Sequence, residues 1–232
     1  MGKNIKPIFS YNADVSKNAY MNWRICEHNV AENLVVLESG FEDAAKQMME
    51  SILADNSLKQ ADVLAFPIMY AIDHSIELYL KAIIYNLEQL ETGVANNYKT
   101  HDIQILFSTM LSLIKKQELK TKGLQAYVAP LKEYLDELYA HIADSKGKMR
   151  MDFARYPFDT DRNPHFYVCA MENVVVDMEN LLNRYSEITD CLEGLCCMYD
   201  TKLEAKSKMQ DSQYSVGNRL SCDLRLDTQE ES

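Results

Sequence analysis

The chain has 232 residues, with 47% hydrophobic residues, 7 glycines and 5 prolines. A chain of this length supports one hydrophobic core, and so few turn-forming residues argue against a sandwich or barrel of many short strands. The net charge of −11 disfavours non-specific coating of nucleic acid, because an acidic surface repels the phosphate backbone.

Signals for export or membrane insertion are not visible in the sequence. Residues 1–25 lack the continuous apolar run of a signal peptide, and no stretch approaches about 18 apolar residues. The six cysteines do not show the paired spacing of a zinc site. We therefore expect a cytoplasmic protein with reduced thiols, no metal, no other cofactor and no membrane association.

Apolar residues recur at helical spacing along most of the chain. The pattern predicts five helices, with approximate bounds 18–55, 61–91, 100–117, 124–144 and 163–209. Thr100 is the expected N-cap of the third helix, with Asp102 in its first turn. Asn163 is the expected N-cap of the fifth, with Pro164 at the first helical position, where proline is favoured.

These elements predict an all-α fold, an up-and-down helical bundle of about five helices with a long C-terminal helix. Residues 1–17 are expected to form an N-terminal arm and residues 18–209 the bundle. Residues 210–232 carry no apolar period, so they are expected to form a disordered tail.

One face of the second predicted helix carries Asp73, Glu77 and Lys81 at intervals of four residues. A glutamate four residues before a lysine is the favourable orientation for an ion pair on a helix. We therefore expect Glu77 and Lys81 to form a structural ion pair, within a solvated or partly buried ladder of charges.

Three short motifs, taken in their order along the chain, indicate a family resemblance. The first is the helical run Ala71–Ala82, in which Glu77 and Lys81 lie among apolar residues, and the second is Thr100-His101-Asp102-Ile103 at the start of the next helix. The third is Arg155-Tyr156-Pro157, ahead of the last long helix. Over roughly residues 20–190 this order resembles the HEPN superfamily, the helical domains named for higher eukaryotes and prokaryotes nucleotide-binding.

The resemblance implies a helical bundle, commonly a homodimer, in a prokaryotic RNA-linked, toxin–antitoxin or antiviral defence context. Many proteins of this superfamily are metal-independent ribonucleases with an Arg and a His separated by four to six residues, the first of which is usually polar. Arg162-Asn163 matches the beginning of that motif. The His would fall at 167, 168 or 169, where none occurs, and His165 follows after only two intervening residues.

Arginine and histidine suit RNA cleavage without a metal. A histidine titrates near neutral pH and can take the 2′-hydroxyl proton, whereas a guanidinium matches phosphate oxygens. Arg162 and His165 are therefore the candidate catalytic pair, since a helix beginning at Pro164 would place His165 in its first turn. There the helix dipole favours a neutral imidazole.

Three further residues are candidates for a phosphate-binding cleft, namely Arg155, His101 and Asn163. The loops before the third and fifth predicted helices could bring Arg155 and His101 together. Alternatively, Arg155 and Arg162 only pair with nearby aspartates, and His101 only orients its loop.

Two hypotheses of function follow from the resemblance and the motif. The first is an endoribonuclease that binds RNA or a nucleotide. The second is a catalytically inactive scaffold, sensor or antitoxin-like regulator that binds a protein partner or a nucleotide. A third is an unrelated helical interaction protein that dimerises through its last helix.

Overall fold

The computed structural model describes residues 6–96, 98–117, 123–143 and 151–226, and beyond Met209 it describes the backbone only. Within these residues it contains five α-helices and no named strand. The α-helices are α1 (Val30–Ala54), α2 (Ala61–Glu91), α3 (Ile103–Lys116), α4 (Leu124–Ala143) and α5 (Met178–Leu226), with short 3₁₀ helices η1 (Val15–Lys17) and η2 (Met151–Ala154). The predicted all-α bundle is confirmed.

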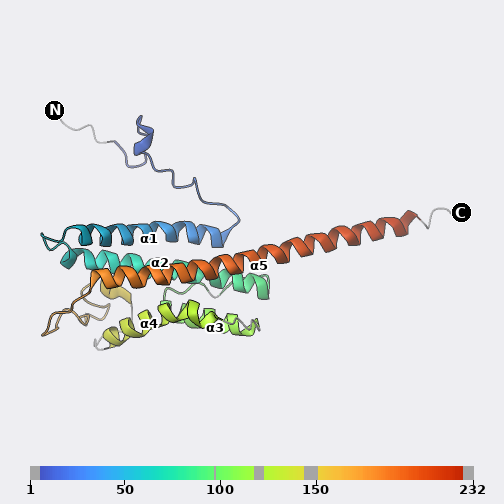
Figure 1. The fold of residues 1–232 in the computed structure, drawn as a ribbon. Helices are drawn as coiled ribbons and strands as arrows, with labels where there is room; N and C mark the ends of the chain where they lie inside the picture. Colours follow the sequence, from blue (N-terminus) through green and yellow to red (C-terminus); the bar gives the residue numbers. More distant parts are fainter. Residues whose placement is uncertain (1–5, 97, 118–122, 144–150, 227–232) are drawn as a thin grey trace.

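The central element is α2, which packs against α1, α3, α5 and η2. α1 and α2 run antiparallel, α5 lies along them, and α3 and α4 form the opposite side (Figure 1). α5 starts at the end of the bundle where α1 ends and α2 begins, and its C-terminal part projects well beyond the other helices (Figure 1). The segment between η2 and α5 lies at that same end.

The position of α2 explains its composition. Eighteen of its 31 residues are buried, as expected for a helix that contacts neighbours on most of its circumference. By length and composition α2 is also apolar enough to cross a membrane, with a mean hydropathy of 1.2 in its most apolar window. Within its most apolar 18 residues, 56% are buried inside the bundle. Burial in the core therefore also explains why α2 is so apolar.

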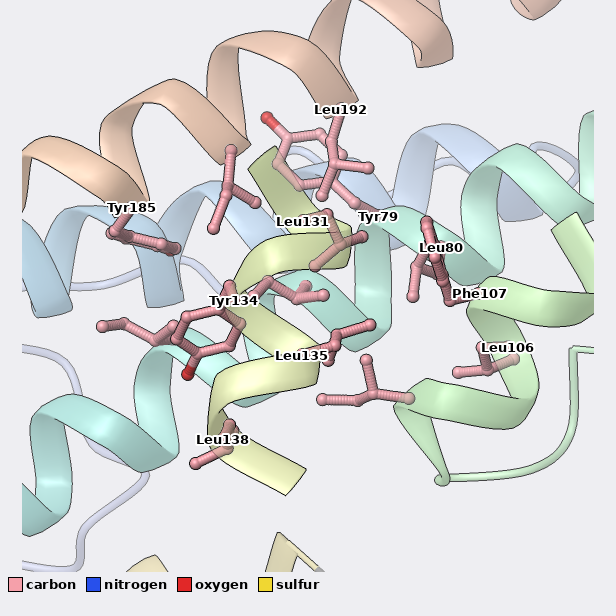
Figure 2. Close-up of a cluster of buried hydrophobic side chains, with 14 of the residues drawn as sticks. Tyr79, Leu80, Leu106, Phe107, Leu131, Tyr134, Leu135, Leu138, Tyr185 and Leu192 are labelled. Atoms are coloured by element: carbon pink, nitrogen blue, oxygen red, sulfur yellow. The ribbon is translucent and has the colours of Figure 1, made fainter. Parts of the chain in front are cut away.

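The core is continuous from α1 to α5. Figure 2 shows one part of it, where side chains from α2, α3, α4 and α5 converge. The labelled residues are Tyr79, Leu80, Leu106, Phe107, Leu131, Tyr134, Leu135, Leu138, Tyr185 and Leu192. Leu80 and Leu106 are fully buried, and removing such a side chain typically costs about 2–5 kcal/mol.

Two helix starts differ from the sequence prediction because polar side chains cap the chain later than expected. α1 begins at Val30 rather than near residue 18, since Asn29 accepts a hydrogen bond from the Glu32 amide at 3.1 Å. α3 is capped by Asp102 instead of Thr100, with Asp102 Oδ1 accepting from the Ile105 amide at 3.0 Å. The expected bounds of α2 and α4 agree with the structure to within one residue.

The largest difference concerns α5, which begins at Met178 and not at Pro164. Pro164 instead forms an isolated antiparallel bridge with Phe158. Asp177 supplies the cap, since its carboxylate accepts from the Asn180 amide at 3.0 Å. At the other end the helix continues through Leu226, into the segment that was expected to be a disordered tail.

A buried polar network crosses the bundle between α1, α2 and α5. Tyr185 Oη donates to Ser75 Oγ at 2.7 Å, and Ser75 Oγ donates to Glu38 Oε1 at 2.7 Å. The Glu38 side chain is fully buried, and its second oxygen has no partner among the described residues. Burial, opposed in part by the Ser75 hydrogen bond, raises the pKa of Glu38 to about 8.

Candidate functional site

A cleft of about 660 Å³ opens where α2, the start of α3 and η2 meet. The three segments that carry the family resemblance all contribute to it. Its lining residues are Tyr70, Asp73, His74, Glu77, Thr100, His101, Asp102, Ile103, Ile105, Tyr139, Asp152 and Arg155. The structure thus brings His101 and Arg155 into one cleft, although 54 positions separate them in the sequence.

Glu77 is the charged centre of this cleft. Its Oε1 accepts from Lys81 Nζ at 2.7 Å and from His101 Nδ1 at 2.9 Å, and His74 Nδ1 lies 3.6 Å from its Oε2. Burial raises its pKa, but the contacts with His74, Lys81 and His101 outweigh burial and lower the pKa of Glu77 to about 2. Glu77 is therefore a carboxylate at neutral pH, paired with Lys81 as the sequence predicts.

The His101 ring is held by a contact with Glu77, but most of the side chain is exposed to solvent. Its Nδ1 faces the Glu77 carboxylate, which can only accept, so Nδ1 carries the proton and Nε2 is left as the reactive nitrogen. The side chain is 83% exposed. On either side the backbone is held, because Thr100 Oγ1 accepts from the Asp102 amide at 3.2 Å and Asp102 caps α3. A histidine oriented by a carboxylate and open to solvent is suited to proton transfer.

Arg155 lines the same cleft from the end of η2. Its guanidinium lies over two aromatic rings, 5.6 Å from the Tyr70 centroid and 5.3 Å from the Tyr156 centroid. No ion pair joins Arg155 to a carboxylate among the described residues. The alternative in which Arg155 only neutralises a nearby aspartate therefore has no contact to support it, and its charge is available to an anion.

Asp73 forms part of the cleft floor and differs from its neighbours in the predicted ladder of charges. It does not contact a lysine in the described part of the chain but accepts a hydrogen bond from Tyr134 Oη at 3.0 Å. Its other oxygen is buried without a partner there. Burial, opposed in part by the Tyr134 hydrogen bond, raises the pKa of Asp73 well above its ordinary range, which favours the protonated carboxyl.

His74 is a further cleft residue for which the sequence predicts no functional role. Its ring packs edge-on against Phe41, with centroids 4.4 Å apart, and stacks on Tyr70 at 5.9 Å. Both His74 and Asp73 lie one turn or less from Glu77 on α2. A sequence signal was available, since polar residues at positions i, i+1 and i+4 of a helix lie within an arc of about 100°, on one side of the helix.

Arg162 and His165 are not placed as a catalytic pair on a helix N-terminus. They belong to a tight loop in which the Asp159 amide donates to Asn163 O at 2.9 Å and Asp159 Oδ1 accepts from the Asn163 amide at 2.8 Å. Asn163 therefore holds the loop together through Asp159, and is not a helix cap. Neither Arg162, Asn163 nor His165 lines the cleft that contains His101.

His165 points into the protein interior. Its side chain is only 1% exposed, and both ring nitrogens are buried without a partner among the described residues. The ring stacks near Tyr167, with centroids 6.4 Å apart. The expectation that His165 sits in a first helical turn is wrong, because the chain there is pinned by the bond from the His165 amide to Pro157 O.

Arg162 is exposed at the tip of the loop and has a φ of +64°. For a residue with a Cβ this left-handed conformation costs roughly 1–2 kcal/mol. We expect Arg162→Gly to raise the unfolding free energy by about 0.5–1 kcal/mol, since glycine adopts this φ without strain but loses more backbone entropy. Urea denaturation measures the change, and a loss of stability would mean that the side chain makes an important contact.

Among the described residues no group of three or more His, Cys, Asp or Glu side chains is arranged to hold a metal ion. Comparison of the chain with protein-family models, with curated proteins and with solved structures gives no match. The resemblance to the HEPN superfamily therefore depends on the three motifs alone, and these motifs surround the cleft.

Proposed function

We propose that the cleft is the active site of a metal-independent endoribonuclease, acting in the RNA-linked or defence context that the HEPN resemblance implies. The observation that supports this most directly is the pair formed by Glu77 and His101, with Nδ1 and Oε1 2.9 Å apart. It lies in the same cleft as the guanidinium of Arg155, which makes no ion pair among the described residues. The residues assigned are thus His101 and Arg155, in place of Arg162 and His165.

The chemistry follows from the roles of these groups. His101 Nε2 removes the proton of a ribose 2′-hydroxyl, and the resulting oxygen attacks the adjacent phosphorus. Arg155 binds the phosphate oxygens, on which charge accumulates in the transition state. The bond from phosphorus to the 5′ oxygen breaks, and His74, in its protonated form, donates a proton to that oxygen. The products are a 2′,3′-cyclic phosphate and a 5′-hydroxyl.

Glu77 serves both histidines in this scheme. Its negative charge stabilises the imidazolium that forms on His101 and the one that His74 must carry before it acts as an acid. Because Lys81 also contacts Glu77, the carboxylate stays ionised and fixed throughout. Glu77 is a positioning residue here, since it acts through the two histidines.

A second candidate function is a catalytically inactive scaffold or regulator that binds a protein partner or a nucleotide in the cleft. It is favoured by a specific observation, the separation of exposed Arg162 from buried His165. The net charge of −11 supports it as well, because it weakens the general attraction of RNA.

The test is cleavage of labelled RNA by the purified protein in EDTA. We expect His101→Ala to lower the rate by about 10²–10⁴-fold, the usual contribution of a general base. His28→Ala is the matched control, because His28 is an exposed histidine ahead of α1 and outside the cleft. Cleavage that persists in His101→Ala would reject the assignment, and no cleavage by the wild-type protein would favour the inactive scaffold.

A further inference from the structure

Residues 6–29 form an arm that exposes many large apolar side chains. In Figure 1 the arm leaves the bundle at the start of α1 and does not lie between helices. Trp23 is 81% exposed and Phe9 is 89% exposed. The other exposed large apolar residues of the arm are Ile8, Tyr11, Val15, Tyr20, Met21 and Ile25. So many exposed large apolar side chains in one segment are typical of a surface that docks on a partner.

A second uncovered apolar surface lies at the opposite end of the bundle. There a hollow of about 900 Å³ is bounded by α4, the start of α5 and residues 170–177. Leu138, Phe153 and Phe166 contribute apolar walls. Beside them Met171 and Val175 are exposed, and Val175 is 81% exposed.

The charges of the two surfaces are complementary. Residues 6–29 contain three basic residues and two acidic residues, a net charge of +1, which leaves −12 for the rest of the chain. In the described arm neither Lys6 nor Arg24 makes an ion pair. The hollow is lined by three carboxylates, Glu137, Glu172 and Asp177, against one guanidinium, Arg184.

Trp23 cannot reach the hollow of its own chain. It lies seven residues before Val30, and an extended chain spans at most about 3.4 Å per residue, roughly 24 Å in all. α1 has 25 residues and is therefore about 37 Å long. The hollow lies near the far end of α1 and on the other side of α2 (Figure 1). The straight path therefore covers most of the length of α1 plus about one helix spacing of 10 Å, which exceeds this reach.

From these observations we infer that the arm docks in the hollow of a second copy of this chain. Reciprocal exchange of two arms closes a twofold dimer and covers both apolar surfaces at once. Aliphatic side chains make up half of the exposed large residues of the arm, which favours a protein groove over a strand of nucleic acid, where stacking on aromatic rings dominates. The inference does not depend on the proposed ribonuclease activity.

Trp23 is the only tryptophan of the chain, so its fluorescence reports on the arm alone. We expect the full-length protein to have a dimer mass by light scattering and a blue-shifted emission, which moves to the red as dilution produces monomers. Val175→Glu is expected to weaken the dimer about tenfold or more, because it places a charge in the contact. Met209→Glu is the matched control, since Met209 is exposed on α5, roughly 46 Å along the helix from its start beside the hollow, does not line the hollow and should leave the dimer unchanged.

Mixing two variants tests the pairing itself. Trp23→Ser has an intact hollow and no tryptophan, whereas Val175→Glu has an intact arm and a damaged hollow. Adding the first to the second should shift the emission of Trp23 to the blue. A monomer at all concentrations, a dimer that both variants retain, or an emission that responds only to added RNA would overturn the inference.

Discussion

Glu77→Ala is expected to lower the free energy of unfolding by about 3 kcal/mol, because it leaves the Lys81 ammonium buried without its carboxylate. Both side chains are only 10% exposed, and their atoms lie 2.7 Å apart. Lys81 has no other ion-pair partner among the described residues. Urea denaturation at neutral pH measures the difference, and a change below about 1 kcal/mol would place the pair among ordinary surface ion pairs.

The double variant Glu77→Gln, Lys81→Met separates the structural role of Glu77 from its role in the cleft. Replacing both members of a buried pair by neutral groups is often close to neutral for stability. We therefore expect the double variant to be more stable than Glu77→Gln alone. If Glu77 also orients His101, the double variant regains stability but not RNA cleavage. Recovery of both properties would mean that Glu77 has a structural role only.

The contribution of Glu77 to the free energy of unfolding also depends on pH. Its pKa is lowered to about 2 in the folded protein, whereas an unfolded glutamate titrates near 4.3. The folded state therefore binds fewer protons than the unfolded state between these values. This contribution is complete above about pH 5 and is lost as the pH falls towards 2.

The helices were predictable because their apolar periods are long and regular. The predicted bounds of α2 and α4 agree with the structure to within one residue. In α2, Ile76, Leu80 and Ile83 repeat at helical spacing without interruption, and polar loops follow the apolar run. The start of α1 was placed too early because polar residues ahead of Asn29 do not break a helical pattern. Only the side-chain cap at Asn29 fixes that boundary.

The α5 boundary shows where local rules fail. Asn163-Pro164 is a favourable helix start by local rules, but here the carboxylate of Asp159 closes a loop on Asn163 instead. The hydrogen bonds of this loop replace those of a helix start, and the spacing of apolar residues in the sequence gives no sign of them. The three β-branched residues Val174–Val176 also disfavour a helix before Asp177.

The cleft was only partly predictable for a related reason. His101 and Arg155 were selected through the resemblance and a possible meeting of two loops, and they do line one cleft. The sequence predicts Asp73 only as part of a ladder of charges and predicts no functional role for His74, because it does not show which face of α2 the loop before α3 covers. His165 was selected for its spacing, whereas the structure buries it.

Glu38→Gln is expected to change the pH dependence of stability strongly. The folded pKa of Glu38 is raised to about 8, chiefly by burial, while the unfolded value is near 4.3. The folded state thus holds a proton that the unfolded state releases between these values. The stability it contributes is complete below about pH 4.5 and is lost as the pH rises through 8.

Glutamine keeps the shape of the side chain and an oxygen that accepts from Ser75 Oγ, but it does not ionise. Between pH 5 and pH 9 the unfolding free energy of the variant should therefore rise by about 4 kcal/mol relative to that of the wild type. Asp73 and the buried tyrosines titrate in both proteins, so their effects cancel in the difference. Chemical denaturation of the two proteins at a series of pH values measures this difference. A constant offset across the series would mean that Glu38 ionises normally in the folded protein and that water reaches its unpartnered oxygen.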